Sequence, residues 1–289
     1  MIALTRRAVL SGAAAGCTAH VVPVGAAPLA IEAWFAPKAE LWDRWARRDD
    51  RSMTRVDHGS WSAFLGKFRR PAPDGIARVD YRRVSGPDKA LLDDYLIRLR
   101  DTEVGRLAAL EQQAFWINLY NALTVRIVLD RYPVASIRDI GFGGLFEQGP
   151  WERKLFRVEG VPLSLNDIEH RILRPIWRDA RLHYVVNCAS LGCPNLGDRA
   201  FDAGDAEATL QDAARAYVNH ERGVRPGADG LVLSKIYGWF AKDFGGSDAA
   251  VVEHLRRHAR DALHSRIDAN PRIGDYAYDW RLNDVEAPG

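Results

Sequence analysis

The chain has 289 residues, of which 47% are hydrophobic and 27% are charged. Its 40 basic and 38 acidic side chains give a formal net charge of +2, with both signs interspersed. This near-neutral charge gives no electrostatic basis for binding nucleic acid or anionic lipid, so we expect neither as a partner. Beyond the first thirty residues, no stretch has the roughly 18 uninterrupted apolar residues of a membrane-spanning helix, and no membrane span is expected.

The first thirty residues are typical of an export signal. Arg6 and Arg7 precede a run of small and apolar residues that ends in VGA at positions 24–26, a sequence suited to a signal peptidase. The two arginines and the modest, alanine-rich hydrophobicity favour the twin-arginine route. We therefore expect residues 1–27 to be an export signal, residues 28–289 to form a single globular domain, and the protein to be periplasmic or secreted.

Hydrophobic periodicity predicts one or two helices over residues 31–70. After a proline-rich break, it predicts a short strand over residues 77–83 and a helix over residues 88–100. The following segment, residues 111–130, is apolar nearly all round. Such a helix is typical of the centre of a domain.

Two amide side chains, Asn118 and Asn121, share one face of this apolar helix. A buried amide must find hydrogen-bond partners, because leaving it unpaired costs on the order of 1 to 3 kcal/mol. Two alternatives are open. The amides either bond backbone groups of neighbouring loops, or they line a cleft and hold a ligand or a catalytic side chain.

Residues 153–164 predict a hairpin that turns at Glu159 and Gly160, and residues 164–177 predict a helix opened by the capping pair Ser164 and Asp167. Polar residues then interrupt the apolar face of this helix.

Glu169 lies in the middle of the apolar arc of that helix. A carboxylate cannot stay charged there without a partner, so it either pairs with an arginine or lysine or belongs to a working site. His170 points away from the arc, and we interpret it as a surface residue or as one that lies behind the site.

The remaining elements are a strand over residues 181–187, a helix over 205–221, the segment 233–244 and a long helix over 247–264. If the segment 233–244 is helical, it brings Asp243 to an apolar face. Asp243 then serves as a helix cap, pairs with a nearby lysine (Lys235 or Lys242), or lines the same cleft as the amides.

Helices dominate this pattern, while the strands are few and partly joined by hairpins. We therefore expect a helix-rich α+β fold, a single domain around a small, partly antiparallel sheet. The sequence contains no glycine-rich dinucleotide motif, no phosphate-binding loop and no H-E-x-x-H pattern, and no cofactor is expected.

Cys188 and Cys193 lie in the stretch RLHYVVNCASLGCPN, and the third cysteine, Cys17, lies inside the expected export signal. Four intervening residues allow the α-carbons to come within the 5 to 6 Å that a disulfide needs, and an oxidising compartment favours the bond. A metal site has too few ligands nearby. The sequence around Cys17 lacks the leucine of a lipoprotein signal, so no lipid anchor is expected.

A catalytic thiolate is the other alternative for this pair. It needs a base within hydrogen-bond reach and a group that orients the base. In an extended strand, His183 would lie roughly 16 Å from Cys188, so a direct pair requires the chain to fold back sharply after Asn187.

The segments AFWINLYNALT, RLHYVVNCASLGCP and LSKIYGWFAKDF together resemble the signatures of the family catalogued as domain of unknown function 547. The resemblance covers roughly residues 60–250 and carries no agreed activity. It implies that seven residues coincide with positions that characterise the family: Asn118, Asn121, Glu169, His183, Cys188, Cys193 and Asp243.

These observations lead to two main hypotheses. The first is a cysteine-dependent hydrolase or acyltransferase for a peptide-like or small amide substrate, with Cys188 as nucleophile, His183 as base and Glu169 or an asparagine as orienting group. The second is a non-catalytic binding or assembly domain with a structural disulfide; a metal-dependent enzyme is a weaker third hypothesis. The candidates for binding or orienting a small-molecule or peptide ligand are Asn118, Asn121, Asn187, Asp243 and Cys193.

Overall fold

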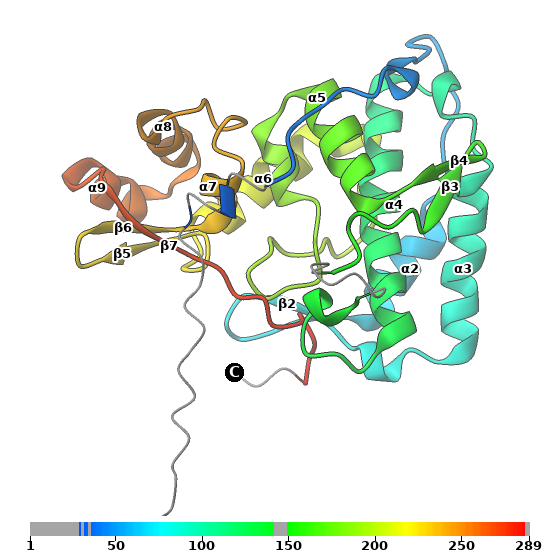
Figure 1. Ribbon diagram of the computed structural model, residues 1–289, viewed down its shortest axis with the longest axis horizontal. Helices are drawn as coiled ribbons and strands as arrows, with labels where there is room; N and C mark the ends of the chain where they lie inside the picture. Colours follow the sequence, from blue (N-terminus) through cyan, green and yellow to red (C-terminus); the bar gives the residue numbers. More distant parts are fainter. Residues whose placement is uncertain (1–28, 30–31, 34–35, 142–148, 287–289) are drawn as a thin grey trace, which may run out of the picture.

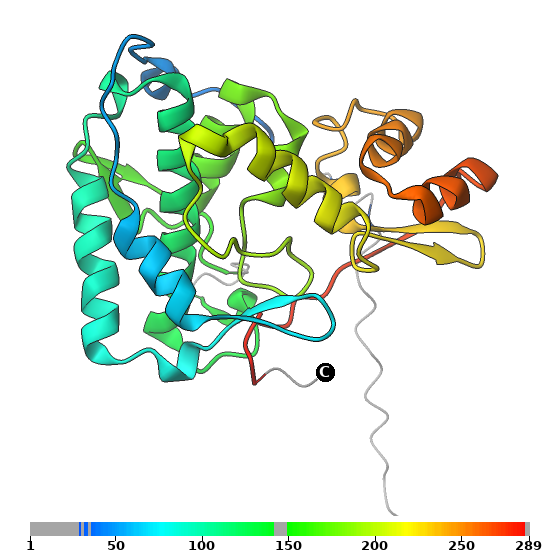
Figure 2. The same ribbon diagram turned by 180° about the vertical axis from the view of Figure 1, so that it is seen from behind.

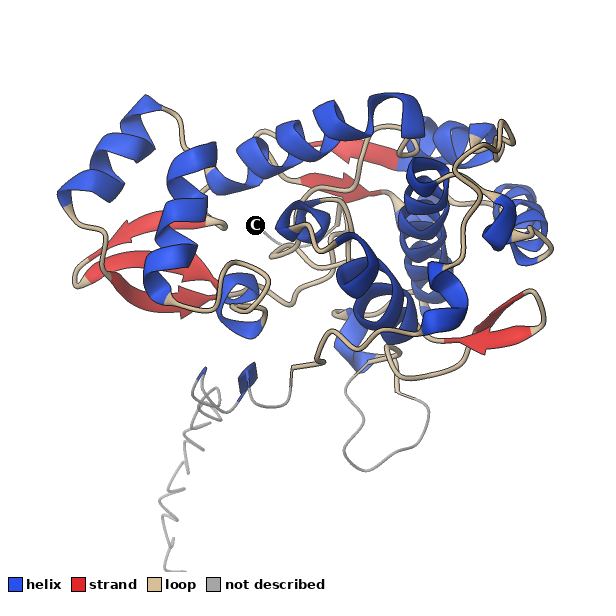
Figure 3. Ribbon diagram, turned by 90° about the horizontal axis from the view of Figure 1, so that it is seen from above, coloured by secondary structure: helices blue, strands red, loops and turns tan. Residues whose placement is uncertain are grey.

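The computed structural model describes residues 29, 32–33, 36–141 and 149–286 (Figure 1). The predicted export signal, residues 1–27, lies outside the described residues. For the described residues, the prediction of a helix-rich α+β fold is confirmed. Helices surround three small sheets of two or three strands, and Figure 3 shows that these sheets lie apart from one another. No described helix is long and apolar enough to cross a membrane.

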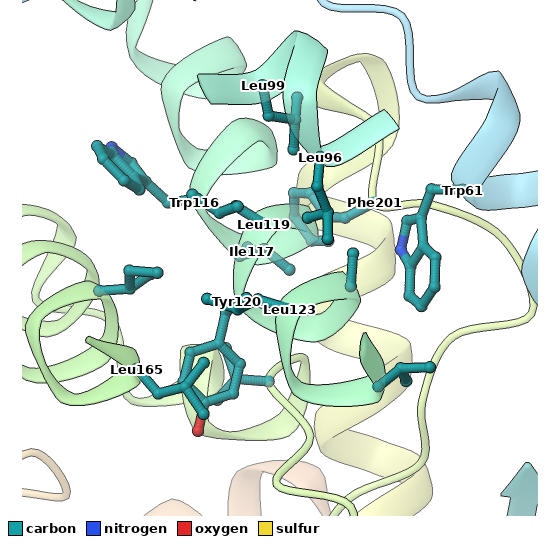
Figure 4. Packing of buried hydrophobic residues seen from close by; sticks show 14 of the residues in the cluster. Trp61, Leu96, Leu99, Trp116, Ile117, Leu119, Tyr120, Leu123, Leu165 and Phe201 are labelled. Atoms are coloured by element: carbon teal, nitrogen blue, oxygen red, sulfur yellow. The ribbon is translucent and has the colours of Figure 1, made fainter. Parts of the chain in front are cut away.

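Three helices form the centre of the larger hydrophobic core: α2 (Gly59–Phe68), α3 (Gly86–Arg100) and α4 (Ala109–Arg131). The α4 helix is buried on nearly all sides, as its apolar sequence predicts. Figure 4 shows its Trp116 on the side of the helix away from Trp61 of α2, where Trp116 packs against Trp45. The prediction of a central helix over residues 111–130 is therefore confirmed.

Two antiparallel hairpins flank this core. The first pairs β1 (Arg69–Pro71), which was not predicted, with β2 (Ala77–Val79). Strand β2 is shorter than the predicted strand over residues 77–83, because the chain turns into a 3-10 helix at Tyr81–Arg83. The pair β3 (Phe156–Val158) and β4 (Val161–Leu163) confirms the predicted hairpin. Its turn residues Glu159 and Gly160 have φ angles of 47° and 76°, the left-handed conformation of a type I′ turn.

The predicted helix over residues 164–177 forms as a π-helical segment, Asp167–Leu173, followed by α5 (Arg174–Trp177). Ser164 and Asp167 cap its start reciprocally: the Asp167 amide donates to Ser164 Oγ over 3.1 Å, and the Ser164 amide donates to Asp167 Oδ2 over 2.8 Å. The predicted capping pair is confirmed.

The strand predicted over residues 181–187 is wrong. Residues Ala180–Tyr184 form a 3-10 helix, which Asp179 caps by accepting a hydrogen bond from the Arg181 amide. The apolar side chains of this segment are buried against helices, and its backbone does not pair with a strand. Their burial therefore does not require an extended chain. The segment packs against α6 (Ala206–Val218).

A second hydrophobic core lies at the other end of the molecule, around the three-stranded sheet. Its strands are β5 (Val224–Gly227), β6 (Gly230–Ser234) and β7 (Ile273–Ala277). Strand β6 pairs antiparallel with β5 and parallel with β7. Helix α6 runs from the helical part towards this sheet (Figure 2).

The remaining helices of this end are α7 (Lys235–Trp239), α8 (Asp248–His258) and α9 (Asp261–Ala269). The single long helix predicted over residues 247–264 is wrong, because it breaks at Ala259. Asn219 causes the break from outside: its Nδ2 donates to the His258 carbonyl and its Oδ1 accepts from the Arg260 amide.

Two further predictions concern the ends of the described chain. Within residues 36–70, the first predicted helix forms only as the 3-10 turn Asp43–Ala46, whereas α2 confirms the second. After β7, the chain crosses back to the helical part (Figure 1), where the Leu191 amide donates to Arg281 and the Val79 amide donates to Asn283. This returning segment brings residues 278–284 against the cysteine turn.

Candidate active site

Cys188 and Cys193 form a disulfide, with their α-carbons 6.3 Å apart. Of the alternatives for this cysteine pair, the structure therefore shows the disulfide. A sulfur in a disulfide is no nucleophile for acyl transfer, so any reaction of the Cys188 thiolate requires prior reduction.

The backbone around Cys188 is held by buried asparagines. Asn121 donates to the Val185 carbonyl and accepts from the Asn187 amide, each over 2.8 Å. Asn187 in turn donates to the Pro194 carbonyl and accepts from the Ala189 amide. Ala189 has a φ angle of 59°, a strained conformation for a residue other than glycine, and the asparagine network holds it there.

Asn118, one turn away on α4, serves a different loop. Its Nδ2 donates to the Phe201 carbonyl over 2.8 Å, and its Oδ1 accepts from the Phe201 amide over 2.9 Å. Both amides on this helix therefore bond backbone groups, which is the first of the two alternatives. Asn121 orients the cysteine turn, whereas Asn118 does not contact it through a hydrogen bond.

A buried charged cluster lies between the 3-10 helix and the loop after α7. His183 Nε2 donates to Asp243 Oδ2 over 2.7 Å, and Arg174 Nε donates to the same oxygen over 2.6 Å. The ring of Phe240 stacks on His183, with the ring centroids 4.6 Å apart, and the Arg174 guanidinium lies 4.5 Å from its centroid. Although burial opposes it, the hydrogen bonds from His183 and Arg174 hold the pKa of Asp243 well below its usual range.

Glu169 completes the cluster, with 11% of its side chain exposed. Its Oε1 lies 3.8 Å from His183 Nδ1 and 3.9 Å from His170 Nδ1. Burial, with a contribution from the Glu169 carboxylate, raises the pKa of Tyr120 well above its usual value. Glu169 thus lies beside two histidines rather than pairing with the arginine or lysine that was one alternative.

His170 is buried, so the alternative that placed it on the surface is wrong. Arg174 donates to its Nδ1 over 2.9 Å, and burial lowers the pKa of His170 to about 4. The neutral ring lies behind the cluster. Asp243 pairs with Arg174 and His183, whereas Lys235, one of the lysines considered for it, bonds Glu32.

Tyr278 lies against the cysteine turn. Its hydroxyl lies 3.2 Å from the Sγ atoms of both Cys188 and Cys193 and accepts a hydrogen bond from Ser190 over 3.0 Å. Burial raises the pKa of Tyr278, and the charge of Glu169 adds to this rise. Tyr278 also packs against Trp239 and Trp280, which are half-buried, so an aromatic wall adjoins the sulfurs.

His183 reaches the charged cluster but not the sulfurs. In the part of the chain that the structure describes, its hydrogen bond goes to Asp243, and none joins it to Cys188 or Cys193. The candidate residues named from the sequence therefore divide between two networks, one around the sulfurs and one around Asp243.

Sequence reasoning missed four residues that build these networks: Tyr120, Arg174, Phe240 as a stacking partner, and Tyr278. Arg174 had a signal, since it is a cation on the same apolar helix as Glu169. Tyr278 had none, because it lies in the irregular segment after β7, and only the tertiary fold brings that segment to the cysteines.

Among the described residues, no group of three or more histidine, cysteine, aspartate or glutamate side chains is arranged to hold a metal ion. A cavity of about 650 Å³ opens between α3, α4 and β3, lined by residues such as Asp93, Ile97 and Arg126. Neither the cysteines nor Glu169 line it, so the site is argued from its hydrogen bonds and not from this cavity.

Residues 104–218 match a family model described as "Protein of unknown function, DUF547". The match includes most of the candidate residues and leaves Asp243 and Tyr278 outside it. Comparison with the curated proteins gave no match, and neither did comparison with the solved structures. The match supports the resemblance seen in the sequence: residues 104–218 of this chain are similar to the DUF547 family, whose function is unknown.

Proposed function

We propose that the protein is a hydrolase or acyltransferase for a peptide-like or small amide substrate, and that reduced Cys188 is its nucleophile. One observation carries the proposal: the backbone at Ala189, directly after Cys188, is strained and donates its amide to the Asn187 side chain, while the Asn187 amide donates to the Asn121 side chain. Strain that the surrounding structure over-determines in this way is concentrated at reactive sites.

The adjoining charged cluster supplies the acid and base. Asp243 accepts a hydrogen bond from Nε2 of His183, and Glu169 Oε1 lies 3.8 Å from Nδ1 of the same ring, so two carboxylates flank the imidazole. Glu169 is the member that takes up or releases the proton, since 11% of its side chain reaches solvent while His183 is only 3% exposed. This assigns His183 to the positioning of Glu169 and gives Cys188 its direct neighbours in Ser190 and Tyr278.

The disulfide favours a second candidate function, a non-catalytic binding or assembly domain. In that case the bond braces the turn beside the aromatic wall, and the thiols never appear in the working protein. The two candidates differ in one respect that can be measured, which is whether a free Cys188 turns over a substrate.

The test compares two single substitutions, Cys193→Ser and Cys188→Ser, neither of which can form the disulfide. Both are assayed against a panel of peptide anilides and small amides and esters. We expect turnover only from the variant that retains Cys188, and from the wild type only after reduction. Equal activity of both variants, or none in either while both remain folded by circular dichroism, would reject the cysteine mechanism.

We also propose that the protein is exported by the twin-arginine route, which is supported by Arg6, Arg7 and the apolar run after them. Replacing both arginines by lysine should retain the protein in the cytoplasm, as cell fractionation would show. A periplasmic or secreted double variant would contradict this.

A further inference from the structure

The two cysteines of the disulfide differ in their exposure to solvent. Cys188 is half-buried, whereas Cys193 is buried with 4% of its surface exposed. An incoming thiolate must approach a sulfur along the axis of the bond, so access decides which sulfur is attacked. Cys188 is therefore the sulfur that an external thiol reaches.

The hydroxyls of Ser190 and Tyr278 lie 3.3 and 3.2 Å from Cys188 Sγ, but a backbone amide donates only to the other sulfur. The backbone amide of Cys188 donates to Cys193 Sγ over 3.0 Å, and the hydroxyl of Tyr278 donates to it over 3.2 Å. Donors aimed at a sulfur stabilise its thiolate, and a stabilised thiolate is the better leaving group. The environment of Cys193 thus suits a sulfur that leaves when Cys188 is attacked.

The turn has anchors that do not depend on the disulfide. The Gly192 amide donates to the Asp279 carbonyl over 2.8 Å, and the hydroxyl of Tyr217 donates to the Gly192 carbonyl over 2.7 Å. A Cβ on residue 192 would lie 2.8 Å from the Asp279 amide nitrogen, so glycine permits this close contact. Together with the asparagine bonds, these contacts hold both ends of the turn when the sulfurs separate.

From these three features we infer that the Cys188–Cys193 disulfide undergoes thiol–disulfide exchange with an external dithiol, either a small molecule or a protein. This activity goes beyond the proposed hydrolase and does not require it. Where the proposed function holds, the same exchange produces the nucleophile.

The exchange has two steps. A thiolate of the dithiol attacks Cys188 Sγ, the bond between the two sulfurs breaks, and Cys193 leaves as a thiolate, so that a mixed disulfide forms on Cys188. The second thiolate of the reductant then attacks the reductant's first sulfur, which is bonded to Cys188 Sγ in the mixed disulfide. It releases Cys188 as a thiolate, both protein thiolates take up protons, and the dithiol is oxidised by two electrons to a cyclic disulfide.

The experiment treats the folded wild-type protein with dithiothreitol and counts thiols with a chromogenic disulfide reagent, without denaturant. We expect two thiols per chain more than in the untreated protein, since Cys17 counts equally in both, while the circular dichroism spectrum stays native. No gain of thiols in the folded protein, with two more appearing only after unfolding in urea, would overturn the inference. Amide hydrolysis plays no part in this readout, so a failure of the proposed function leaves it intact, and exchange without hydrolysis would reject only the proposed function.

The order of attack is tested with Cys193→Ser, which has lost the leaving sulfur. Incubated with oxidised glutathione, the folded variant should accumulate a mixed disulfide on Cys188, detected by mass spectrometry of peptides. The Cys188→Ser variant should form at least about tenfold less on the buried Cys193. Equal modification of both variants would contradict the assignment of Cys188 as the attacked sulfur.

Tyr278 acts as a positioning residue in this scheme, and Tyr278→Phe should slow reduction by dithiothreitol about tenfold, since it removes one hydrogen bond to the departing thiolate. Tyr276→Phe is the matched control, because Tyr276 lies two residues earlier and is half-buried. It should reduce at the wild-type rate. Equal rates in both variants would remove Tyr278 from the scheme.

Discussion

His183 donates from Nε2 to Oδ2 of Asp243 over 2.7 Å, although 60 residues separate them in the sequence. Arg174 donates to the same oxygen, so one carboxylate holds a histidine and a buried guanidinium in fixed positions. The charge of Asp243 is therefore required by both partners, and the orientation of His183 towards Glu169 depends on it.

Replacing Asp243 by asparagine should destabilise the protein on the order of 3 kcal/mol. The change removes the negative charge beside Arg174, whose side chain is only 5% exposed, and a buried charge without its partner is costly. Urea unfolding of the variant measures the loss. Asp268→Asn is the matched control, because its ion pair with Arg256 is largely exposed, and it should cost less than about 1 kcal/mol. Equal losses would mean that the Asp243 cluster contributes no more than a surface pair.

Asn121→Ala and Asn118→Ala should have similar effects on stability but different effects on the cysteines. Each removes one amide of α4 that makes two hydrogen bonds to the backbone, and each should cost about 2 kcal/mol. Only Asn121 holds the turn before Cys188, so only its loss should change the rate at which dithiothreitol reduces the disulfide. The same rate change in both variants would show that general destabilisation, and not the turn, sets the reactivity.

Sequence periodicity was sufficient where a segment's own pattern decides its structure. The apolar residues of α4, the left-handed turn at Glu159 and Gly160, and the cap at Ser164 are all local signals. It failed where a distant segment decides. Asn219 breaks the predicted helix at Ala259 from about 40 positions away in the chain, and its side chain leaves no local trace there.

The candidate site divides in the same way. Glu169 stood out because a carboxylate interrupts an apolar face, and the cysteines stood out by their type and spacing. Tyr278 could not be found, because its contacts with the sulfurs arise only when the segment after β7 returns across the molecule. The hypothesis of a cleft came from three separate polar interruptions, which the structure resolves into backbone anchoring by the amides and a charged cluster around Asp243.

Stability should fall as the pH drops from about 6.5 to 4, in part through His58. Burial lowers the pKa of His58 to about 4, despite the charges of Asp57 and Asp202, and Tyr95 contacts its Nδ1 over 2.6 Å. Between pH 6.5 and 4, His58 binds a proton in the unfolded chain but stays neutral in the folded chain. Its contribution to the free energy of unfolding is therefore present above pH 6.5 and is lost as the pH falls towards 4.

His58→Asn retains an acceptor for Tyr95 and removes this titration. Its free energy of unfolding should fall about 1 to 2 kcal/mol less than that of the wild type between pH 6.5 and 4.5. Urea unfolding at the two pH values gives both numbers. Parallel losses in variant and wild type would mean that His58 titrates alike in the folded and unfolded chains.

The most direct test of the account is the alkylation rate of Cys188 in the Cys193→Ser variant, measured with iodoacetamide at pH 7 in the folded chain and in the same chain unfolded in urea. If the asparagine-held turn, Ser190 and Tyr278 make this sulfur reactive, the folded chain should be alkylated about tenfold faster than the unfolded one. A folded-state rate equal to or below the unfolded rate would contradict a reactive Cys188 and leave the cysteine pair with a structural role.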